Sequence, residues 1–425
     1  MRGQRPFKQK TASLICTCQK GVTFVNYNKK TIRDIDVSGK KVLLRCDFNV
    51  PHDKSTGIIQ DITRIAESIP TIQYLLEHNA AVIICSHLGR PHGIWNPALS
   101  LASVAGCLQS MLNKPVAITR DVLGSDTKAL AGNLHPGQVM LIENLRYRIE
   151  EEKNDPEFSK ELAGLAHLFV FDAFGASHRA HASTEGVSHY LPSVAGFLVE
   201  KELEVMGNAL ENPRRPFTAV LGGAKVSDKI GVIRHLLDLA DTILIGGGMC
   251  YTFLAAKGAS VGKSLLEEDR LDFAREMIAL AEQKGVQLLL PVDHMSAAEF
   301  SKSAEPRWID SLDLPADVMG LDIGPRTVEL YENALKASGT VFWNGPMGVF
   351  EFPAFANGTF AVAKSIAALS NAVTIIGGGD SAYAVEEMGF ADKMTHISTG
   401  GGAALEFMEG LDLPGIACLA DRGKA

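Results

Sequence analysis

The chain has 425 residues, 46% of them hydrophobic and 21% charged, and its net charge of −8 disfavours nucleic acid as the main partner. A single hydrophobic core is not expected at this length, so we predict two domains. The longest apolar runs are far too short to span a bilayer, and we expect no membrane association. Seven scattered cysteines, an odd number, fit a reducing compartment, so we expect a cytoplasmic protein.

Residues 1–28 differ in composition from the rest of the chain. They contain five basic residues and no acid: Arg2, Arg5, Lys8, Lys10 and Lys20. They lack the apolar stretch of a secretory signal, which leaves a transit peptide or a disordered extension, and we favour the extension. Cys16 and Cys18 have no second cysteine cluster after them, and we expect no metal site there.

Short apolar runs that favour strands alternate with helix-favouring segments along the remaining chain. The runs are 41–48, 81–86, 139–142 and 168–172 in the first half, and 217–221, 242–245, 286–290, 340–343 and 373–376 in the second. They are apolar without alternation, as in parallel strands that are covered on both faces. The pattern predicts α/β architecture with two doubly wound parallel-sheet (Rossmann-like) domains.

The predicted boundary between these domains is a charged helical segment, 200–211. Residues 212–216, which contain two prolines, cannot continue this helix, and the strand–helix rhythm restarts at Phe217. We therefore predict a connecting helix between an N-terminal domain at 29–198 and a C-terminal domain at 199–402. A helix is also predicted from the stripe of Leu271, Ala274, Ile278 and Ala281, ending at Gly285.

Basic residues follow several strands of the first half, where the carboxyl ends of parallel strands should bring them together. They are Arg64, His87, Arg90, Arg146 and Arg179. Arginine binds phosphate and carboxylate in bidentate fashion, so the group predicts an anionic ligand, although each arginine alone could form a surface salt bridge. His178 and His181 could join Asp172 around a metal, but no further ligand stands at a recognisable spacing, and we expect phosphate contacts or structural hydrogen bonds.

Two segments of the second half repeat one plan, in which a strand runs into three glycines and then a helix. The triplets are Gly246–Gly248 and Gly377–Gly379. This plan leaves backbone N–H groups bare at the positive end of a helix dipole, which suits phosphate. Asp380 and Ser381 follow the second triplet as oxygen ligands for a Mg²⁺ ion that bridges nucleotide phosphates.

Lys225 and Lys229 also follow a strand and two glycines. Being four residues apart, they would share one face of a helical turn, and the strand–Gly-Gly–Lys order favours phosphate binding over a solvated face. Residues 258–264 resemble a P-loop but do not match it. They have three residues between the glycines where a P-loop has four, and they follow a helix where a P-loop follows a strand. A dinucleotide-binding fingerprint is absent as well, because neither triplet continues as Gly-x-Gly-x-x-Gly.

With these residues in view, the chain closely resembles the phosphoglycerate kinase family from about residue 30 to residue 413. The motifs are VLLRCDFNVP (42–51), SHLGRP (86–91), DAFGASHRAHAS (172–183), LGGAKVSDK (221–229), FWNGPMGVFE (342–351), IGGGDS (376–381) and HISTGGG (396–402). The resemblance implies a glycolytic phosphotransferase that reversibly transfers the acyl phosphate of 1,3-bisphosphoglycerate to ADP, giving 3-phosphoglycerate and ATP. It further implies Mg²⁺ as cofactor, a phosphoglycerate site in the N-terminal domain, and a tail at 403–425 that returns to that domain.

The resemblance also assigns roles to matching positions. Substrate-binding residues are Asp47, Phe48, Asn49, Arg64, His87, Leu88, Gly89, Arg90, Arg146 and Arg179. Nucleotide-binding residues are Lys225, Lys229, Gly320, Glu351 (on the ribose), Gly378, Gly379, Asp380 (also the metal ligand) and Ser381. Catalytic residues are Arg64, Lys225, Gly379 and Gly402. Three positions depart from the family pattern: Ile62 and Phe171, where Asp and Asn are usual, and Arg326, which replaces a common Lys.

The expected mechanism is direct in-line transfer. The leaving carboxylate is stable and ADP is already ionised, so catalysis reduces to placement and charge neutralisation without a general base. Because the two ligands bind different domains, we predict a hinge near 196–204 and closure that excludes water. We expect a monomer. The alternatives are a nicotinamide-dependent oxidoreductase on the same fold class, and a phosphometabolite-binding or scaffolding protein without activity.

Overall fold

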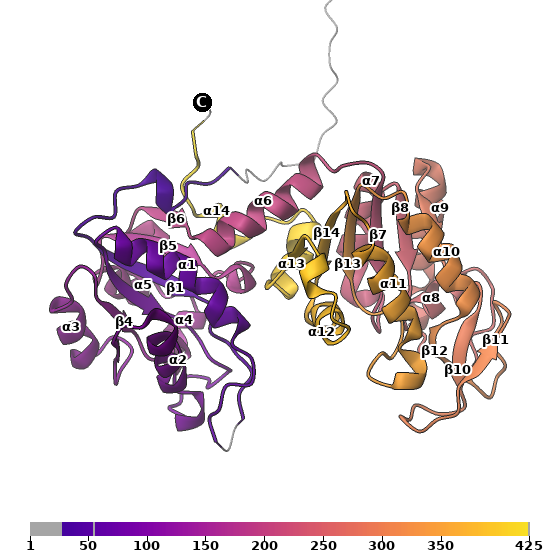
Figure 1. Ribbon diagram of the computed structural model, residues 1–425, viewed down its shortest axis with the longest axis horizontal. Coiled ribbons are helices and arrows are strands. Elements are labelled where there is room, and N and C mark those ends of the chain that lie inside the picture. Colours follow the sequence, from indigo (N-terminus) through magenta and orange to yellow (C-terminus); the bar gives the residue numbers. More distant parts are fainter. Residues whose placement is uncertain (1–27, 54–55, 424–425) are drawn as a thin grey trace, which may run out of the picture.

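Two parallel sheets of six strands each form the cores of two domains in the computed structural model, which describes residues 28–53 and 56–423 (Figure 1). The predicted fold class is confirmed. The predicted N-terminal extension, with Cys16 and Cys18, lies outside the described residues apart from Asn28. All five cysteines within the described residues are free thiols. No helix in that same part of the chain has the length and apolar character needed to cross a membrane.

The sheet of the N-terminal domain has the strand order β3-β4-β2-β1-β5-β6. Its strands are β1 (Lys41–Cys46), β2 (Ala81–Cys85), β3 (Val116–Ile118), β4 (Val139–Leu141), β5 (Leu168–Asp172) and β6 (Ser193–Ala195). Its helices are α1 (Thr63–Glu77), α2 (Ala102–Leu112), α3 (Ser125–Gly132), α4 (Ile149–Glu152) and α5 (Pro156–Ala163). Val42 and Leu44 pack towards α1 and α2, whereas Leu43 packs towards α5 on the other face. Both faces are thus covered, as the continuous apolar runs predicted.

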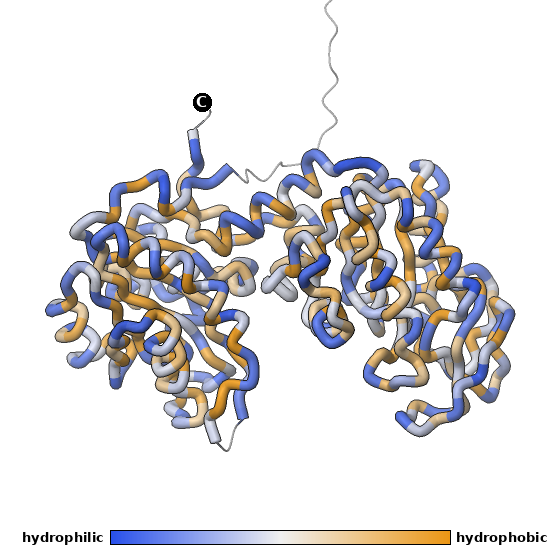
Figure 2. Tube along the Cα trace, viewed as in Figure 1, coloured by the Kyte–Doolittle hydropathy of each residue, from blue (hydrophilic) through white to orange (hydrophobic). Residues whose placement is uncertain are grey.

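The sheet of the C-terminal domain has the order β15-β14-β13-β7-β8-β9, and a small antiparallel sheet, β11-β10-β12, lies beside it. The strands are β7 (Phe217–Leu221), β8 (Thr242–Ile245), β9 (Gln287–Leu289), β10 (His294–Ala297), β11 (Arg307–Ile309), β12 (Met319–Ile323), β13 (Thr340–Asn344), β14 (Val373–Gly377) and β15 (His396–Ile397). The helices are α7 (Ile230–Leu239), α8 (Cys250–Ala256), α9 (Leu271–Lys284), α10 (Pro325–Leu335), α11 (Asn357–Ala367) and α12 (Gly379–Glu387). Hydrophobic residues gather along the sheets of both domains (Figure 2).

Helix α6 (Phe197–Glu211) joins the two domains and begins three residues earlier than the sequence predicted. The carboxylate of Asp172, at the end of β5, accepts the N–H groups of Leu198 (2.9 Å) and Val199 (3.2 Å) and so caps the helix. Farther along, the buried Glu202 accepts a hydrogen bond from the His396 ring (2.6 Å) and another from the Thr399 N–H (2.9 Å). The helix is therefore tied to both domains.

The end of the chain lies against the N-terminal domain. After α13 (Gly402–Met408), the N–H of Gly415 in α14 (Pro414–Ala417) donates to the Ser177 carbonyl (2.8 Å). The Ala420 N–H donates to the Ser193 carbonyl (3.0 Å), which continues this contact to the edge of the N-terminal sheet.

Candidate active site

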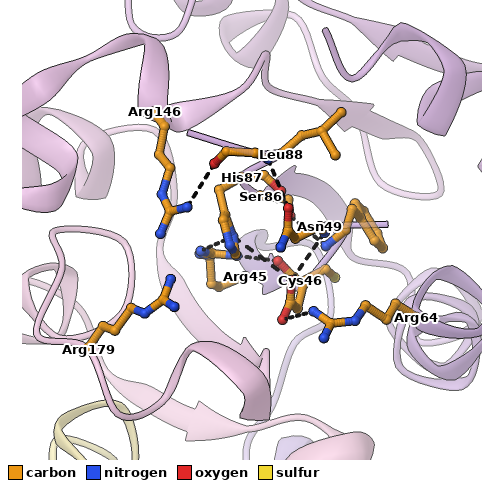
Figure 3. A network of polar contacts seen from close by, with 12 residues as sticks. Arg45, Cys46, Asn49, Arg64, Ser86, His87, Leu88, Arg146 and Arg179 are labelled. Atoms are coloured by element: carbon orange, nitrogen blue, oxygen red, sulfur yellow. Dashed lines mark hydrogen bonds and ion pairs between the residues drawn. The ribbon is translucent and has the colours of Figure 1, made fainter. Parts of the chain in front are cut away.

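Four arginines gather around His87 at the carboxyl edge of the N-terminal sheet (Figure 3). Arg45 lies in β1 one residue before its end, Arg64 lies in the first turn of α1, and Arg146 and Arg179 follow β4 and β5. Arg146 and Arg179 approach the centre from one side and Arg64 from the other (Figure 3). The predicted convergence of cations after the strands is thus present.

Arg64 is held by the buried carboxylate of Asp47. Its Nη1 lies 2.5 Å from Asp47 Oδ2, and the Asn49 N–H donates to Asp47 Oδ1 (3.1 Å). Burial alone would raise the pKa of Asp47, yet the surrounding positive charges, notably Arg64 and Arg45, lower it to about 2. Asp47 is therefore ionised at neutral pH and orients Arg64 in the absence of substrate.

Arg45 is a member of this site that the sequence reasoning missed. Its side chain is 1% exposed, its Nε donates to Ser183 Oγ (2.7 Å), and its Nη2 lies 3.1 Å from His87 Nδ1. Burial lowers the pKa of His87 well below its usual value, so the neutral ring accepts this hydrogen bond. The available signal was the position of Arg45 in the run at 41–48, directly between the apolar residues Leu44 and Cys46.

Arg146 is buried and positions the SHLGRP loop. Its Nη1 donates to the Gly89 carbonyl (2.8 Å), and its Nε lies 3.1 Å from Glu152 Oε1. Burial and the neighbouring cations Arg179 and Arg45 lower the pKa of Arg146 to about 10. The cost of crowding these charges would fall if an anion bound between them.

The remaining predicted substrate residues lie around the same loop. Asn49 Oδ1 accepts the Gly89 N–H (2.9 Å), and Leu88 donates its N–H to the Asn144 side chain (3.2 Å). Phe48 is fully buried in the core, while Arg90 stands exposed at the end of the loop. The structure thus gathers the predicted set but places Phe48 as a packing residue.

The two histidines that follow β5, His178 and His181, lie beside Arg179 and close to the arginine cluster. No group of three or more potential metal ligands occurs among residues 28–53 and 56–423. The His178 ring accepts a hydrogen bond from Arg179 Nε (3.1 Å), and burial lowers the pKa of His181 to about 4. The structural hydrogen bonding expected for His178 is present.

The C-terminal domain contains a cavity of about 470 Å³. It is lined by Gly223, by Gly247 and Gly248 of the first triplet, by Tyr251, and by three of the predicted nucleotide residues, Gly320, Glu351 and Asp380. Gly320 is confined, since an added Cβ would lie 1.7 Å from the Tyr251 hydroxyl oxygen. Its N–H donates to Ser264 Oγ (2.9 Å), which fixes this wall of the cavity.

The two glycine triplets differ in a way that the sequence did not show. The N–H groups of Gly246 and Gly247 donate to the carbonyls of Leu221 (2.8 Å) and Met347 (2.9 Å), so the expectation of bare N–H groups is wrong for this triplet. Its glycines instead allow close backbone packing. In the second triplet Gly378 has φ 90°, and an added Cβ on Gly379 would meet open space. Here the first-turn amides of α12 have no intrahelical acceptor and are available to a phosphate.

The two lysines do not share a helical face, and that prediction is also wrong. A 3₁₀ turn at Ser227–Lys229 separates them, with Lys225 exposed in the loop and Lys229 buried. The Lys229 ammonium donates to Asn344 Oδ1, and burial lowers the pKa of Lys229 to about 8. The glycines before the turn let the chain bend sharply instead of entering α7 directly.

Asp380 and Ser381 begin α12 but have different surroundings. Asp380 is exposed and lines the cavity, whereas Ser381 is buried and its hydroxyl accepts the Gly345 N–H (2.6 Å). Mg²⁺ commonly takes one carboxylate together with substrate phosphates. The free position of Asp380 fits such an ion, and Ser381 contributes a structural hydrogen bond.

Gly402 and the three departures from the family pattern have different surroundings. An added Cβ on Gly402, at the start of α13, would be 4.0 Å from His178 Nε2. Phe171 packs against Gly415 of the tail and lies opposite Arg45 where β5 pairs with β1. Arg326 is exposed and pairs with Asp310, and Ile62 is exposed beside Arg64.

Comparison with known proteins agrees with the motifs. The model of the phosphoglycerate kinase family matches residues 32–411. The phosphoglycerate kinase of Clostridium botulinum (strain Alaska E43) is 60% identical over 400 residues, covering 93% of this chain and 100% of the relative. That of Clostridium kluyveri is 56% identical over 399 residues, with 93% and 100% coverage. The solved structure of phosphoglycerate kinase from Coxiella burnetii has a TM-score of 0.85 at 41% identity and covers 92% of this chain and 98% of that one. The Pyrococcus horikoshii structure has a TM-score of 0.78 at 33% identity, with the same coverage.

Proposed function

The chain belongs to the phosphoglycerate kinase family, and we propose that it works by direct in-line transfer between its two sites. The reaction is the reversible transfer of the acyl phosphate of 1,3-bisphosphoglycerate to ADP, giving 3-phosphoglycerate and ATP. An oxygen of the terminal phosphate of ADP attacks phosphorus, and the P–O bond to the acyl group breaks as the carboxylate leaves with the electron pair. Since neither group needs a proton moved, the enzyme supplies position and charge compensation.

The phosphoglycerate site is proposed at the arginine cluster. Arg146, Arg179 and His87 would bind the phosphoglycerate, while Asp47 and Asn49 hold the walls of the site. Arg64 would turn from Asp47 towards the moving phosphoryl group and stabilise its charge, as an arginine finger does. The observation that carries this assignment is the buried excess of guanidinium groups around His87.

The nucleotide site is proposed at the C-terminal cavity. Glu351 would bond the ribose, Gly320 and Tyr251 would border the base, and the amides after Gly378 would receive the phosphates. Mg²⁺, when bound on Asp380 and the phosphate oxygens, supplies positive charge to the nucleotide. Lys225 is exposed and free to reach the transferred group, which its position before the 3₁₀ turn allows.

Closure of the domains is proposed to join these sites. We assign residues 29–198 to the phosphoglycerate domain and 199–402 to the nucleotide domain, with the tail at 403–425 on the former. The proposed hinge at 196–204 covers the first half of α6, where Asp172 and Glu202 tie the helix to opposite domains. We also propose that the protein acts as a cytoplasmic monomer.

A coupled assay with 3-phosphoglycerate, ATP and Mg²⁺ tests the function. The chain should turn over both substrates, and Asp380→Ala should lower the rate at least tenfold and raise the Mg²⁺ concentration required. Asp392→Ala, a nearby acidic residue outside the cavity lining, is the matched control and should leave the rate unchanged. Absence of turnover in the unaltered chain would contradict the assignment and favour a binding or scaffolding role.

A further inference from the structure

Two large side chains, Ile62 and Tyr383, are exposed close in sequence to Arg64 of the phosphoglycerate site and Asp380 of the nucleotide site. Ile62 is 47% exposed and lies two residues before Arg64, at the N-cap of α1. Tyr383 is 53% exposed and lies three residues after Asp380 in α12. Burial of such side chains is favourable, so their exposure beside the reacting groups needs an explanation.

Neither side chain belongs to the buried face of its own helix. The buried face of α1 is formed by Ile65, Ser68, Thr71, Ile72 and Leu75, and Ile62 makes no side-chain cap. The buried face of α12 is formed by Ser381, Ala384 and Val385, which places Tyr383 on the outer face of the helix. The Tyr383 ring has one aromatic neighbour, Phe350, at 6.0 Å between centroids.

The segments that carry these side chains face each other. Helix α12 lies on the side of the C-terminal domain that is turned towards the N-terminal domain (Figure 1). Glu386 shares the outer face of α12 with Tyr383; burial raises its pKa, and the negative charge of Asp61, the neighbour of Ile62, raises it further. Asp61 and Glu386 therefore repel each other between the two segments.

The domains also touch close to Arg64. Gly175 of the N-terminal domain lies between Asp47 and Arg64 of that domain and Thr399, which follows β15 of the C-terminal domain. A Cβ added to Gly175 would be 2.7 Å from Asp47 Oδ2, 3.3 Å from the Thr399 carbonyl oxygen and 3.8 Å from Arg64 Nη1. Thr399 in turn is held by Glu202 of α6. A rotation about this contact would bring the start of α1 towards α12.

We propose that Ile62 and Tyr383 pack against each other when the domains close, and that they act as positioning residues for transfer. This inference rests on the proposed closure and adds the contact that holds the closed state. Ile62 lies two residues from Arg64 and Tyr383 three from Asp380, so the contact would set the distance between the arginine and the metal-bearing end of the nucleotide site. Repulsion between Asp61 and Glu386 opposes the contact and weakens as salt is added.

A double-mutant cycle tests this contact, with Ile62→Ala, Tyr383→Ala and the double variant. Each single variant should lower kcat about three- to tenfold, as expected for the loss of one apolar contact, while the affinities for each ligand alone stay unchanged. The double variant should be no slower than the slower single variant, because the contact is lost only once. Leu312→Ala, an exposed leucine beside the small sheet and away from the gap, is the control.

Small-angle scattering separates this inference from the proposed function. With both ligands bound, the unaltered chain should become more compact, and the variants should do so less completely. If the unaltered chain stays extended, the proposed closure is wrong. If the unaltered chain compacts and the variants compact equally, closure stands and the Ile62–Tyr383 contact is refuted. The contact is also refuted if the losses of kcat in the two single variants multiply in the double variant. Thermal unfolding should be unchanged in all variants, because both side chains are exposed.

Discussion

Replacement of Arg64 by alanine separates catalysis from folding. The surroundings of Asp47, Arg64 among them, lower its pKa from 3.8 to about 2 in spite of burial, which corresponds to roughly 2 kcal/mol of net stabilisation of the carboxylate. Loss of Arg64 removes a hydrogen bond to this buried carboxylate, so the free energy of unfolding should fall by about 1.5–3 kcal/mol. If Arg64 acts as an arginine finger, kcat should fall about 10³–10⁵-fold, at least about 4 kcal/mol in the barrier.

The assay is the coupled reaction with both substrates varied, beside urea unfolding of the same variant. Arg148→Ala is the control, because this arginine pairs with Glu150 (2.7 Å) outside the cluster. A loss of kcat below about tenfold, with only the KM for phosphoglycerate changed, would reduce Arg64 to a binding residue and refute the mechanism.

The pH dependence gives an independent check on the Asp47–Arg64 pair. The folded-state pKa of Asp47 lies below the unfolded value, so its stabilisation is present above pH 4 and is lost as pH falls towards 2. Without Arg64 the pKa of Asp47 should rise, and acid unfolding should begin at a higher pH than in the unaltered chain. Identical acid transitions would show that Arg64 does not stabilise this carboxylate.

Three further substitutions test other parts of the two sites. Arg146→Lys should weaken 3-phosphoglycerate binding about 10- to 100-fold in calorimetry, through the loss of one charge-assisted bond, and an unchanged affinity would remove Arg146 from the site. Lys229→Met should weaken ADP binding and leave 3-phosphoglycerate binding unchanged; equal loss of both affinities would indicate general misfolding. Burial raises the pKa of Asp322 to about 8, above its value in the unfolded chain. Between about pH 4 and pH 8 the folded state therefore keeps a proton that the unfolded state loses, and the free energy of unfolding falls as the pH rises through this range. Asp322→Asn should flatten that fall in urea unfolding curves, whereas an unaltered slope would show that Asp322 is ionised in the folded protein.

Much of the fold could be predicted because long apolar runs leave little choice. The runs at 168–172, 217–221 and 242–245 are strands with those same bounds, since each is buried on both faces. Strands β3 and β6 have three residues each and directly follow Pro115 and Pro192, so apolar neighbours do not extend them into a recognisable run. The small sheet of β10, β11 and β12 escaped prediction because its strands mix polar and apolar residues, and β11 is largely exposed.

The candidate site was predictable in kind but not in its internal contacts. Cations after parallel strands must converge, so Arg64, Arg146 and Arg179 could be placed together from their positions alone. The role of Arg45 could not, because it lies inside a strand, where side-chain direction depends on register. The glycine triplets look alike in sequence. In the first, however, the N–H groups of Gly246 and Gly247 donate to backbone carbonyls, whereas after the second the first-turn N–H groups of α12 are available to a ligand. Such differences arise from contacts between segments far apart in the chain.

The central claim is that the arginine cluster and the start of α12 meet around one phosphoryl group. A crystal structure with 3-phosphoglycerate, Mg-ADP and aluminium fluoride, a mimic of the transferred group, tests it directly. We expect the fluoride group in line between the two substrates, with Arg64 and Lys225 in contact with it and Ile62 beside Tyr383. A structure with both ligands bound, the domains apart and no path for Arg64 to reach the nucleotide would contradict direct transfer.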